Sequence, residues 1–325
     1  VLEQESIDLY GDWLGEWASF NLSPDFPTVA KLAAAGMEAK GTPVSGVIAI
    51  DPYTVQAVLA GTGKVEHQGV IIDGTNAADF FIKDIYTQYP DFPDVLAKDQ
   101  LALGLVYASV DSLLKRPLDL RALFDTLPAM AQDGHVKIWS SDPREEAWLQ
   151  ELGLSGDIES KDPSEIVIAI NNSTGGKLDA YVDYRANMFP TCEFTNKEGE
   201  DMIRANLEVT LSNNAPSGLP DYVDIRLDSQ IAEPTSTASL VHVYAPEGAT
   251  QVSNNINGFY APYLIGTEAD RPVWATRAEL NQGESALITN VFEVNRENYP
   301  TSALITASKS TNPITEFAPL PAAIP

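Results

Sequence analysis

The sequence contains a single cysteine, Cys192, and only three histidines among its 325 residues. One cysteine cannot form an intramolecular disulfide, and so few Cys and His residues cannot build a Cys/His metal cluster. The glycine-rich phosphate motifs GxGxxG and the P-loop are also missing. We therefore expect no bound metal and no cofactor, and the two common nucleotide-binding loops are excluded.

Long apolar runs are missing as well. No stretch of about 18 apolar residues occurs, so no segment of this sequence is predicted to span a membrane. The chain begins at Val1 without an initiator methionine or a secretory signal. We expect a fragment whose upstream targeting segment has been removed.

Basic residues are scarce: 20 Lys and Arg stand against 46 Asp and Glu, for a formal net charge of −26. Such a chain repels the phosphates of nucleic acid and an anionic membrane surface. The acids are dispersed along the chain, which is typical of a surface that maintains solubility. We expect no nucleic-acid partner and no broad docking on lipid, whereas a specific basic partner is the alternative.

Residues 1–163 alternate helical and extended patterns, which predicts an α/β or α+β layered domain. The clearest unit starts with the β-branched run at residues 47–50. Asp51 and Pro52 then supply an N-cap and a proline for the first helical turn, and Gly61 and Gly63 end the helix. This pattern predicts strand–helix–strand. Further helices are predicted at residues 76–85, 93–114, 118–132 and 144–152.

The pattern changes to short strands over residues 164–312. Between residues 204 and 212 apolar and polar residues alternate with period two, as in a strand that is buried on one face. About seven such strands separated by turn residues predict an immunoglobulin-like β-sandwich. Residues 313–325 are rich in proline and predict an extended tail. The predicted strands cover residues 166–170, 180–189, 204–212, 239–245, 273–280 and 285–294.

Several segments together resemble one known family. They are Asn21–Thr28 (NLSPDFPT), Gly46–Pro52 (GVIAIDP), Asn171–Asp179 (NNSTGGKLD) and Ser212–Pro216 (SNNAP). The family is a bacterial envelope family known as domain of unknown function 4012, and the resemblance covers nearly the whole chain. It implies an extracytoplasmic location, at the cell surface or in the envelope, with an N-terminal transmembrane anchor that is absent from this chain. It implies no activity.

The N-terminal half also bears a weaker resemblance to the LytR-CpsA-Psr glycopolymer transferases. It is carried by a strand, an Asp-containing turn, a helix and then residues 63–66 (GKVE). The helix that would lie near a polyprenyl pyrophosphate is residues 94–100, which has no arginine, and within residues 76–89 only Lys83 is basic. Arginine forks are the usual pyrophosphate ligands, so the resemblance implies the fold more than the transferase chemistry.

The candidate ligand-binding residues are charged side chains on or just before predicted helices, and each has a structural alternative: Asp51, Lys83, Asp94, Lys98 and Asp99. Asp51 could hold a divalent cation or cap its helix, and the following proline favours the cap. The set at residues 94–99 could bind an ion or phosphate, or form a solvated first turn with an Asp–Lys pair. Lys83 has the same two interpretations. No metal ligand is assigned.

Two further motifs have alternative interpretations. The glycine-rich residues 171–177 could form an anion-binding nest or a hairpin-like turn at a domain junction, and we favour the turn. His135 is interpreted as a strand-edge residue and not as a base, because no Ser or Asp beside it in the sequence has the arrangement of a catalytic triad, although a triad needs only proximity in space.

The favoured functional hypothesis is a non-catalytic cell-envelope protein that binds or positions an envelope glycopolymer, its polyprenyl lipid carrier or an envelope protein. One alternative is a divergent phosphotransferase, in which Mg²⁺ and the candidate residues would hold a polyprenyl pyrophosphate carrier. Another is a structural spacer or adhesion module. Whether the protein is an enzyme stays open.

Overall fold

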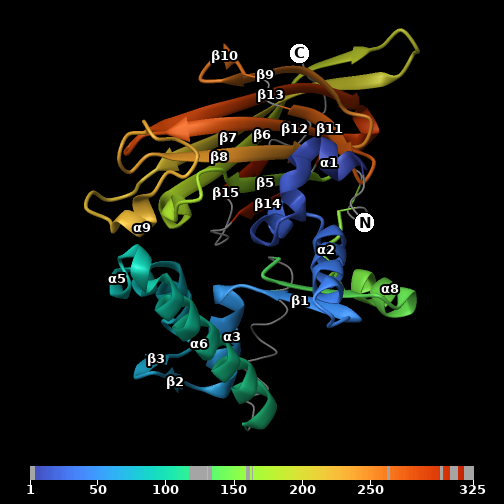
Figure 1. Ribbon diagram of the computed structural model, residues 1–325. Coiled ribbons are helices and arrows are strands. Elements are labelled where there is room, and N and C mark those ends of the chain that lie inside the picture. The colour runs from blue at the N-terminus through green and yellow to red at the C-terminus, as the bar shows by residue number, and fades with distance from the viewer. Residues whose placement is uncertain are drawn as a thin grey trace. The chain divides into compact units, whose positions relative to one another are not determined.

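The chain folds into two compact units in the computed structural model (Figure 1). The first unit contains Val1–Leu32, Asp157–Ser217 and Asp224–Pro325, and the second contains Ala33–Gly156 and Gly218–Val223. The structure describes residues 4–116, 130, 134–158, 162, 164–261, 264–300, 303–307 and 314–317. The units therefore divide the chain differently from the predicted boundary at residue 163. The helix predicted at residues 118–132 lies outside the described residues, apart from residue 130.

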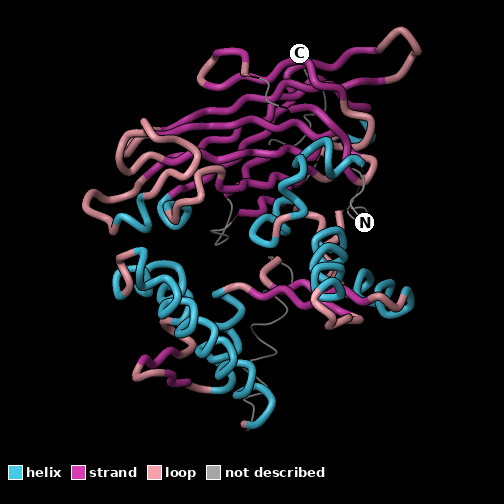
Figure 2. Tube along the Cα trace, viewed as in Figure 1, coloured by secondary structure: helices cyan, strands magenta, loops and turns pink. Residues whose placement is uncertain are grey.

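Helices dominate the N-terminal part of the chain and strands the C-terminal part (Figure 2). This arrangement confirms the predicted mixture of α and β structure. Both the strand–helix–strand unit and the alternating strands at residues 204–212 occur where the sequence patterns predict them.

Two β-sheets form most of the first unit. The six-stranded sheet has the order β10-β9-β13-β7-β6-β15, and the five-stranded sheet has the order β11-β12-β8-β5-β14. Neighbouring strands are antiparallel, except that β14 runs parallel to β5 and β15 parallel to β6. The strands are β5 (Ile166–Asn172), β6 (Val182–Thr195), β7 (Asp201–Asn213), β8 (Thr237–Tyr244), β9 (Thr250–Ile256), β10 (Phe259–Tyr260), β11 (Leu264–Glu268), β12 (Arg271–Leu280), β13 (Ser285–Asn295), β14 (Ala303–Ala307) and β15 (Ile314–Phe317).

The two sheets share one hydrophobic core. Alternate residues of β7 are fully buried in it, among them Leu207 and Val209, while the residues between them face outward. Trp274 of β12 and Phe292 of β13 meet across the sheets with their ring centroids 5.7 Å apart. Burial of this interleaved apolar surface is the main stabilising contribution in a sandwich of this kind.

The five-stranded sheet is buried on its outer face too. Five consecutive residues of β5, Ile166–Ile170, are buried. Ile168 belongs to the core between the sheets, whereas Val167 and Ala169 belong to a second core with side chains from the start of the chain. A continuous apolar run is the pattern expected of a strand covered on both faces.

The cover of this outer face is helical. It consists of α1 (Gln4–Tyr10), the 3₁₀ segments η1 (Gly11–Gly15) and η2 (Trp17–Leu22), and the beginning of α2 (Phe26–Ala39). Their side chains in the second core include Leu9, Leu14 and Leu32. These residues were predicted to belong to the N-terminal domain, but they pack on the sheet formed by the later strands.

The second unit is mainly helical. Strands β1 (Gly46–Ile50) and β4 (Val136–Ser140) form a two-stranded antiparallel sheet, and β2 (Val65–His67) and β3 (Val70–Ile72) form a hairpin. The helices are α3 (Pro52–Thr62), α4 (Ala77–Asp79), the π-helical η3 (Phe80–Asp84), α5 (Ile85–Gln88), η4 (Phe92–Asp94), α6 (Val95–Lys115) and α8 (Pro143–Glu151). Residues Gly218–Val223, which include most of α9 (Asp221–Asp224), join this unit from the connection between β7 and β8.

A separate hydrophobic core holds the second unit together. Leu101 and Leu105 of α6 are fully buried against Leu59 of α3 and Ile72 of the hairpin. None of the helices in the described part of the chain is both long and apolar enough for a membrane span.

Replacing Phe292 by alanine is expected to lower the free energy of unfolding by about 3–5 kcal/mol, because it leaves a cavity in the core between the sheets. Phe259→Ala is the matched control, since that ring is 76% exposed, and it should change stability by less than about 0.5 kcal/mol. Urea unfolding of both variants measures the difference. Equal losses in the two variants would contradict the placement of Phe292 in the core.

Candidate functional site

Asp51 caps helix α3. Its Oδ1 accepts hydrogen bonds from the Thr54 amide at 2.9 Å and from Thr54 Oγ1 at 3.2 Å. Its Oδ2 lies 2.5 Å from Nδ1 of His135. Both carboxylate oxygens therefore have protein partners, which supports the capping interpretation of this candidate.

His135 lies directly before β4 and its side chain is buried. Because β1 and β4 are antiparallel with Ile50 opposite Val136, the residue after β1 meets the residue before β4. The His135 carbonyl accepts from Thr54 Oγ1 at 2.8 Å, and the Tyr53 ring lies 4.9 Å from the imidazole. An imidazole held by a carboxylate is also the arrangement of a general base. Nothing near His135 in the sequence predicts this pair, since it depends on which strands become neighbours.

Lys98 is enclosed on α6. Its ammonium forms a 2.8 Å ion pair with Asp99 and lies 5.3 Å from the ring centroid of Tyr86 and 5.2 Å from that of Tyr222. Burial lowers the pKa of Lys98, but the hydrogen bond with Asp99 and the two tyrosines outweigh it, so the pKa is raised overall. The side chain thus remains a cation, held by one carboxylate and two aromatic faces.

The structure brings together two of the five candidates, Lys98 and Asp99. Asp94 lies at the N-terminus of α6 without a capping hydrogen bond from its side chain. Lys83 lies half-buried in the π-helical segment η3, where its carbonyl accepts from Thr87 Oγ1 at 3.5 Å. The recorded partners of Asp51 all lie on α3 or beside β4 and not on α6. Across the described ranges, no group of three or more His, Cys, Asp or Glu side chains is arranged to hold a metal ion.

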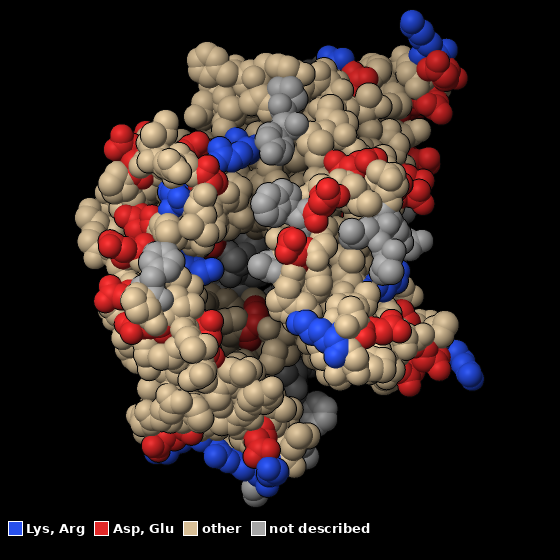
Figure 3. All heavy atoms as spheres, viewed as in Figure 1, with Lys and Arg blue, Asp and Glu red and all other residues tan. Residues whose placement is uncertain are grey.

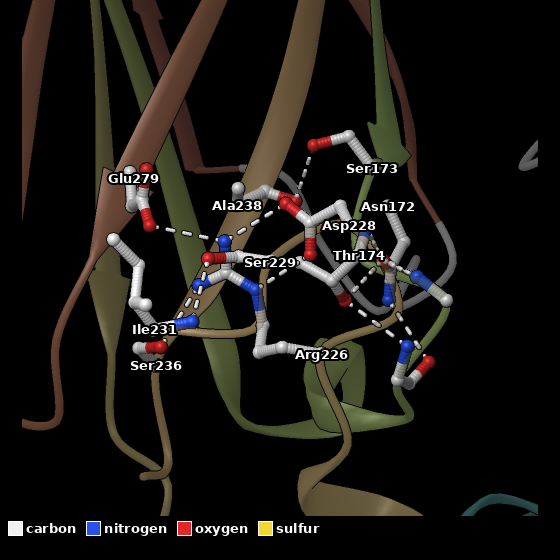
Figure 4. Close-up of polar contacts among 12 residues, drawn as sticks. Asn172, Ser173, Thr174, Arg226, Asp228, Ser229, Ile231, Ser236, Ala238 and Glu279 are labelled. Carbon is white, nitrogen blue, oxygen red and sulfur yellow. Dashed lines mark hydrogen bonds and ion pairs between the residues drawn. The ribbon is translucent and has the colours of Figure 1, made fainter. Parts of the chain in front are cut away.

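The glycine-rich segment after β5 is a turn held by one side chain (Figure 4). Asn172 Oδ1 accepts from the Thr174 amide at 2.7 Å, from Thr174 Oγ1 at 2.7 Å and from the Gly175 amide at 3.2 Å. The Gly176 amide donates to Thr174 Oγ1 at 3.1 Å. These amides are therefore already used, which supports the turn interpretation over an anion-binding nest.

An ion-pair network lies beside this turn in Figure 4. Arg226, whose side chain is 5% exposed, makes two hydrogen bonds to Asp228, at 2.8 and 2.9 Å, and one to Glu279 at 3.0 Å. Arg277 bonds to the same two acids, at 2.7 and 3.2 Å. The charges of the two guanidinium groups and the two carboxylates cancel. The hydrogen bonds with Arg226 lower the pKa of Asp228. The network fixes the loop before β8.

A buried cluster of hydroxyl groups around the carboxylate of Glu268 lies under α1 in the first unit. Glu268 accepts from Ser23 Oγ at 2.9 Å, Ser6 Oγ at 3.4 Å, Tyr244 Oη at 2.5 Å and Tyr10 Oη at 3.2 Å. The two tyrosine hydroxyls also contact each other. Burial raises the pKa of Glu268, although the Tyr244 and Ser23 hydrogen bonds oppose this. No sequence pattern predicts the cluster, because its members lie at both ends of the chain.

The remaining acids are dispersed. Figure 3 shows Asp and Glu side chains scattered over the visible face and not gathered in one patch, with fewer Lys and Arg among them. This distribution agrees with the dispersal of acids along the sequence.

Comparison with known proteins gives one family match. Residues 1–86 match the family described as "Protein of unknown function (DUF4012)". The match confirms the family resemblance for this part of the chain, and it includes Asp51 and Lys83. No curated protein and no solved structure matches the chain.

Replacing Lys98 by methionine removes the ammonium and keeps most of the apolar stem. We expect the free energy of unfolding to fall by about 1–2 kcal/mol, because the ion pair and both cation–π contacts are lost. Lys115→Met is the control, since its side chain is 71% exposed and its pair with Asp111 lies on the surface. Urea unfolding should show less than about 0.5 kcal/mol for the control, and equal effects would contradict the enclosure of Lys98.

Proposed function

We propose that this chain is part of an extracytoplasmic cell-envelope protein that binds or positions an envelope component without chemical turnover. The component would be a glycopolymer, its polyprenyl lipid carrier or an envelope protein. The observation that carries the proposal is the enclosure of Lys98, because the cation expected to hold a pyrophosphate is already paired with Asp99 and covered by two tyrosine rings. A transferase would need that charge free for its substrate.

An exposed apolar face of α6 supports a binding role. Five of its large side chains are between 41% and 76% exposed and are spaced 7, 4, 3 and 4 residues apart, so they share one side of the helix. They are Leu96, Leu103, Tyr107, Val110 and Leu114. Contiguous apolar surface of this kind is typical of contact sites. A polyprenyl chain is the partner whose chemistry fits it most directly.

The same proposal includes a fold for each of the two units. The second unit would be a form of the LytR-CpsA-Psr fold, which its β1–α3–β2 order and its long helix α6 support. The two sheets of the first unit would be a variant of the immunoglobulin-like sandwich, supported by their shared core. The acidic, dispersed surface favours exposure outside the cytoplasm, and a membrane anchor upstream of residue 1 would tether the protein.

A phosphotransferase is the second candidate, because the contact between Asp51 and His135 places a carboxylate on an imidazole. In that role His135 would accept a proton from the attacking hydroxyl, and Mg²⁺ would neutralise the pyrophosphate. The remaining hypothesis, a spacer or adhesion module, predicts no small-molecule ligand at all.

Native mass spectrometry with a short-chain polyprenyl pyrophosphate, with and without Mg²⁺, tests the proposal. We expect a lipid adduct that does not require the metal and that is not converted to product when an acceptor glycan is added. The double variant Leu103→Ser/Leu114→Ser should bind at least about tenfold more weakly, since two apolar contacts are lost. Ile231→Ser is the control, because that side chain is 94% exposed in the first unit.

Different outcomes separate the candidates. Mg²⁺-dependent transfer that is lost in Asp51→Ala would contradict the proposal and establish the transferase. Absence of binding to the lipid, to envelope glycans and to envelope proteins would leave only the spacer.

A further inference from the structure

The N-terminal cover, which we define as residues 4–25, hides a histidine whose imidazole has no hydrogen-bond partner in the described part of the chain. The cover lies on the outer face of the five-stranded sheet, where α1 packs along β11 (Figure 1). His242 on β8 lies on the same face, fully buried, and the Tyr10 ring of α1 is 5.1 Å from its imidazole. Within the described residues, neither nitrogen of this ring has a hydrogen-bond partner.

The surroundings of His242 are apolar on the sheet itself. The residues opposite it in the neighbouring strands are Ala169 of β5 and Ala275 of β12, both buried. These small side chains leave room for the ring but offer no acceptor. A buried polar group without a partner costs free energy, and a buried charge without one costs more. The imidazole is therefore accommodated as the neutral form, and burial lowers the pKa of His242 to about 4.

The titratable groups of the cover and of the neighbouring strands that surround His242 do not offer a counter-charge to a protonated imidazole. Tyr10 and Tyr244 have pKa values raised well above their ordinary range, first by burial, so they remain neutral donors. Both donate to Glu268, which also accepts from serines of the cover. Arg271 of β12 directs its guanidinium to the carbonyls of Asp162 and Glu165, at 2.7 and 2.6 Å. The carboxylate of Asp25 accepts from the amides of Thr28 and Ile158.

We propose that His242 makes the N-terminal cover acid-sensitive, so that protonation of the imidazole releases residues 4–25 from the outer face of the five-stranded sheet. Release admits water to the ring, which is the only way for a proton on it to be solvated where the sheet offers no acceptor. The contact with Tyr10 couples the ring directly to α1. The sandwich core, which lies on the opposite face of the sheet, need not open.

The direction in which pH changes the stability of the covered state distinguishes His242 from Glu268. The pKa of His242 is lower when covered than when free, so the covered state loses stability as the pH falls below the ordinary value of about 6.5. The pKa of Glu268 is raised, so this carboxyl favours the covered state in acid and weakens it as the pH rises through that raised value. Of these two groups, only His242 predicts release on acidification.

The expected change in the opening constant of the cover follows from the pKa of His242 in the covered state and in the free state. Between pH 7.5 and pH 5, a group that changes from about 4 when covered to about 6.5 when free multiplies the opening constant by about 30. Hydrogen–deuterium exchange of peptides from residues 4–25, corrected for the intrinsic rates at each pH, measures this constant. Peptides from β7 and β13 report global unfolding and should stay protected at both pH values.

Three variants test which residue causes the pH dependence of the opening constant. His242→Phe keeps a ring of similar size and cannot be protonated, so its opening constant should change by less than about twofold over the same range. His67→Phe is the control in the second unit and should keep the response of the wild type. Glu268→Gln tests the carboxyl and should also keep the response.

An unchanged opening constant in the wild-type chain would overturn the proposal, as would an equal response in His242→Phe. Loss of the response in Glu268→Gln alone would assign it to the carboxyl and contradict the role of His242. Loss of protection in β7 and β13 together with residues 4–25 would show global unfolding instead. If a variant fails to fold, an unchanged opening constant in the wild-type chain still overturns the proposal.

Discussion

The five-stranded sheet requires an apolar cover on each of its faces, and much of the first unit follows from that requirement. Residues Ile166–Ile170 are apolar without interruption, so neither face of β5 can be left in water. One face packs on the other sheet, and the other packs on residues 4–32. The beginning of the chain is therefore part of the sandwich unit, and the hydroxyls that bond to Glu268 come from both the cover and the sheet.

Polar groups in this protein mostly interact with one another. Lys98 contacts two tyrosine rings, Asp51 caps a helix and contacts His135, and Arg226 joins a neutral network with three other charged side chains. Groups that are satisfied internally have little capacity left to bind a small anion. The exposed surface includes dispersed acids and the apolar side of α6, which under the proposed function would contact a large partner or a lipid.

Features that depend on neighbouring residues could be predicted from the sequence. The cap at Asp51, before a proline, and the alternation in β7 involve residues within a few positions of one another. Features that depend on distant pairing could not. They include the contact of Tyr222 with Lys98, the meeting of Asp51 with His135, and the pairing of Ile314–Phe317 with β6, where the prediction was an extended tail. The candidate ligand-binding residues were chosen from the sequence alone, and the partners that enclose Asp51 and Lys98 are known only from the structure.

The chain passes from one unit to the other four times, near residues 32, 156, 217 and 223. Neither unit is therefore a continuous stretch of the gene, and no single cut in the chain releases an intact one. A fragment ending at residue 163 would carry the cover without its sheet, and the complementary fragment would expose the outer face of β5. Separating the two units would therefore need cuts at more than one of these crossings.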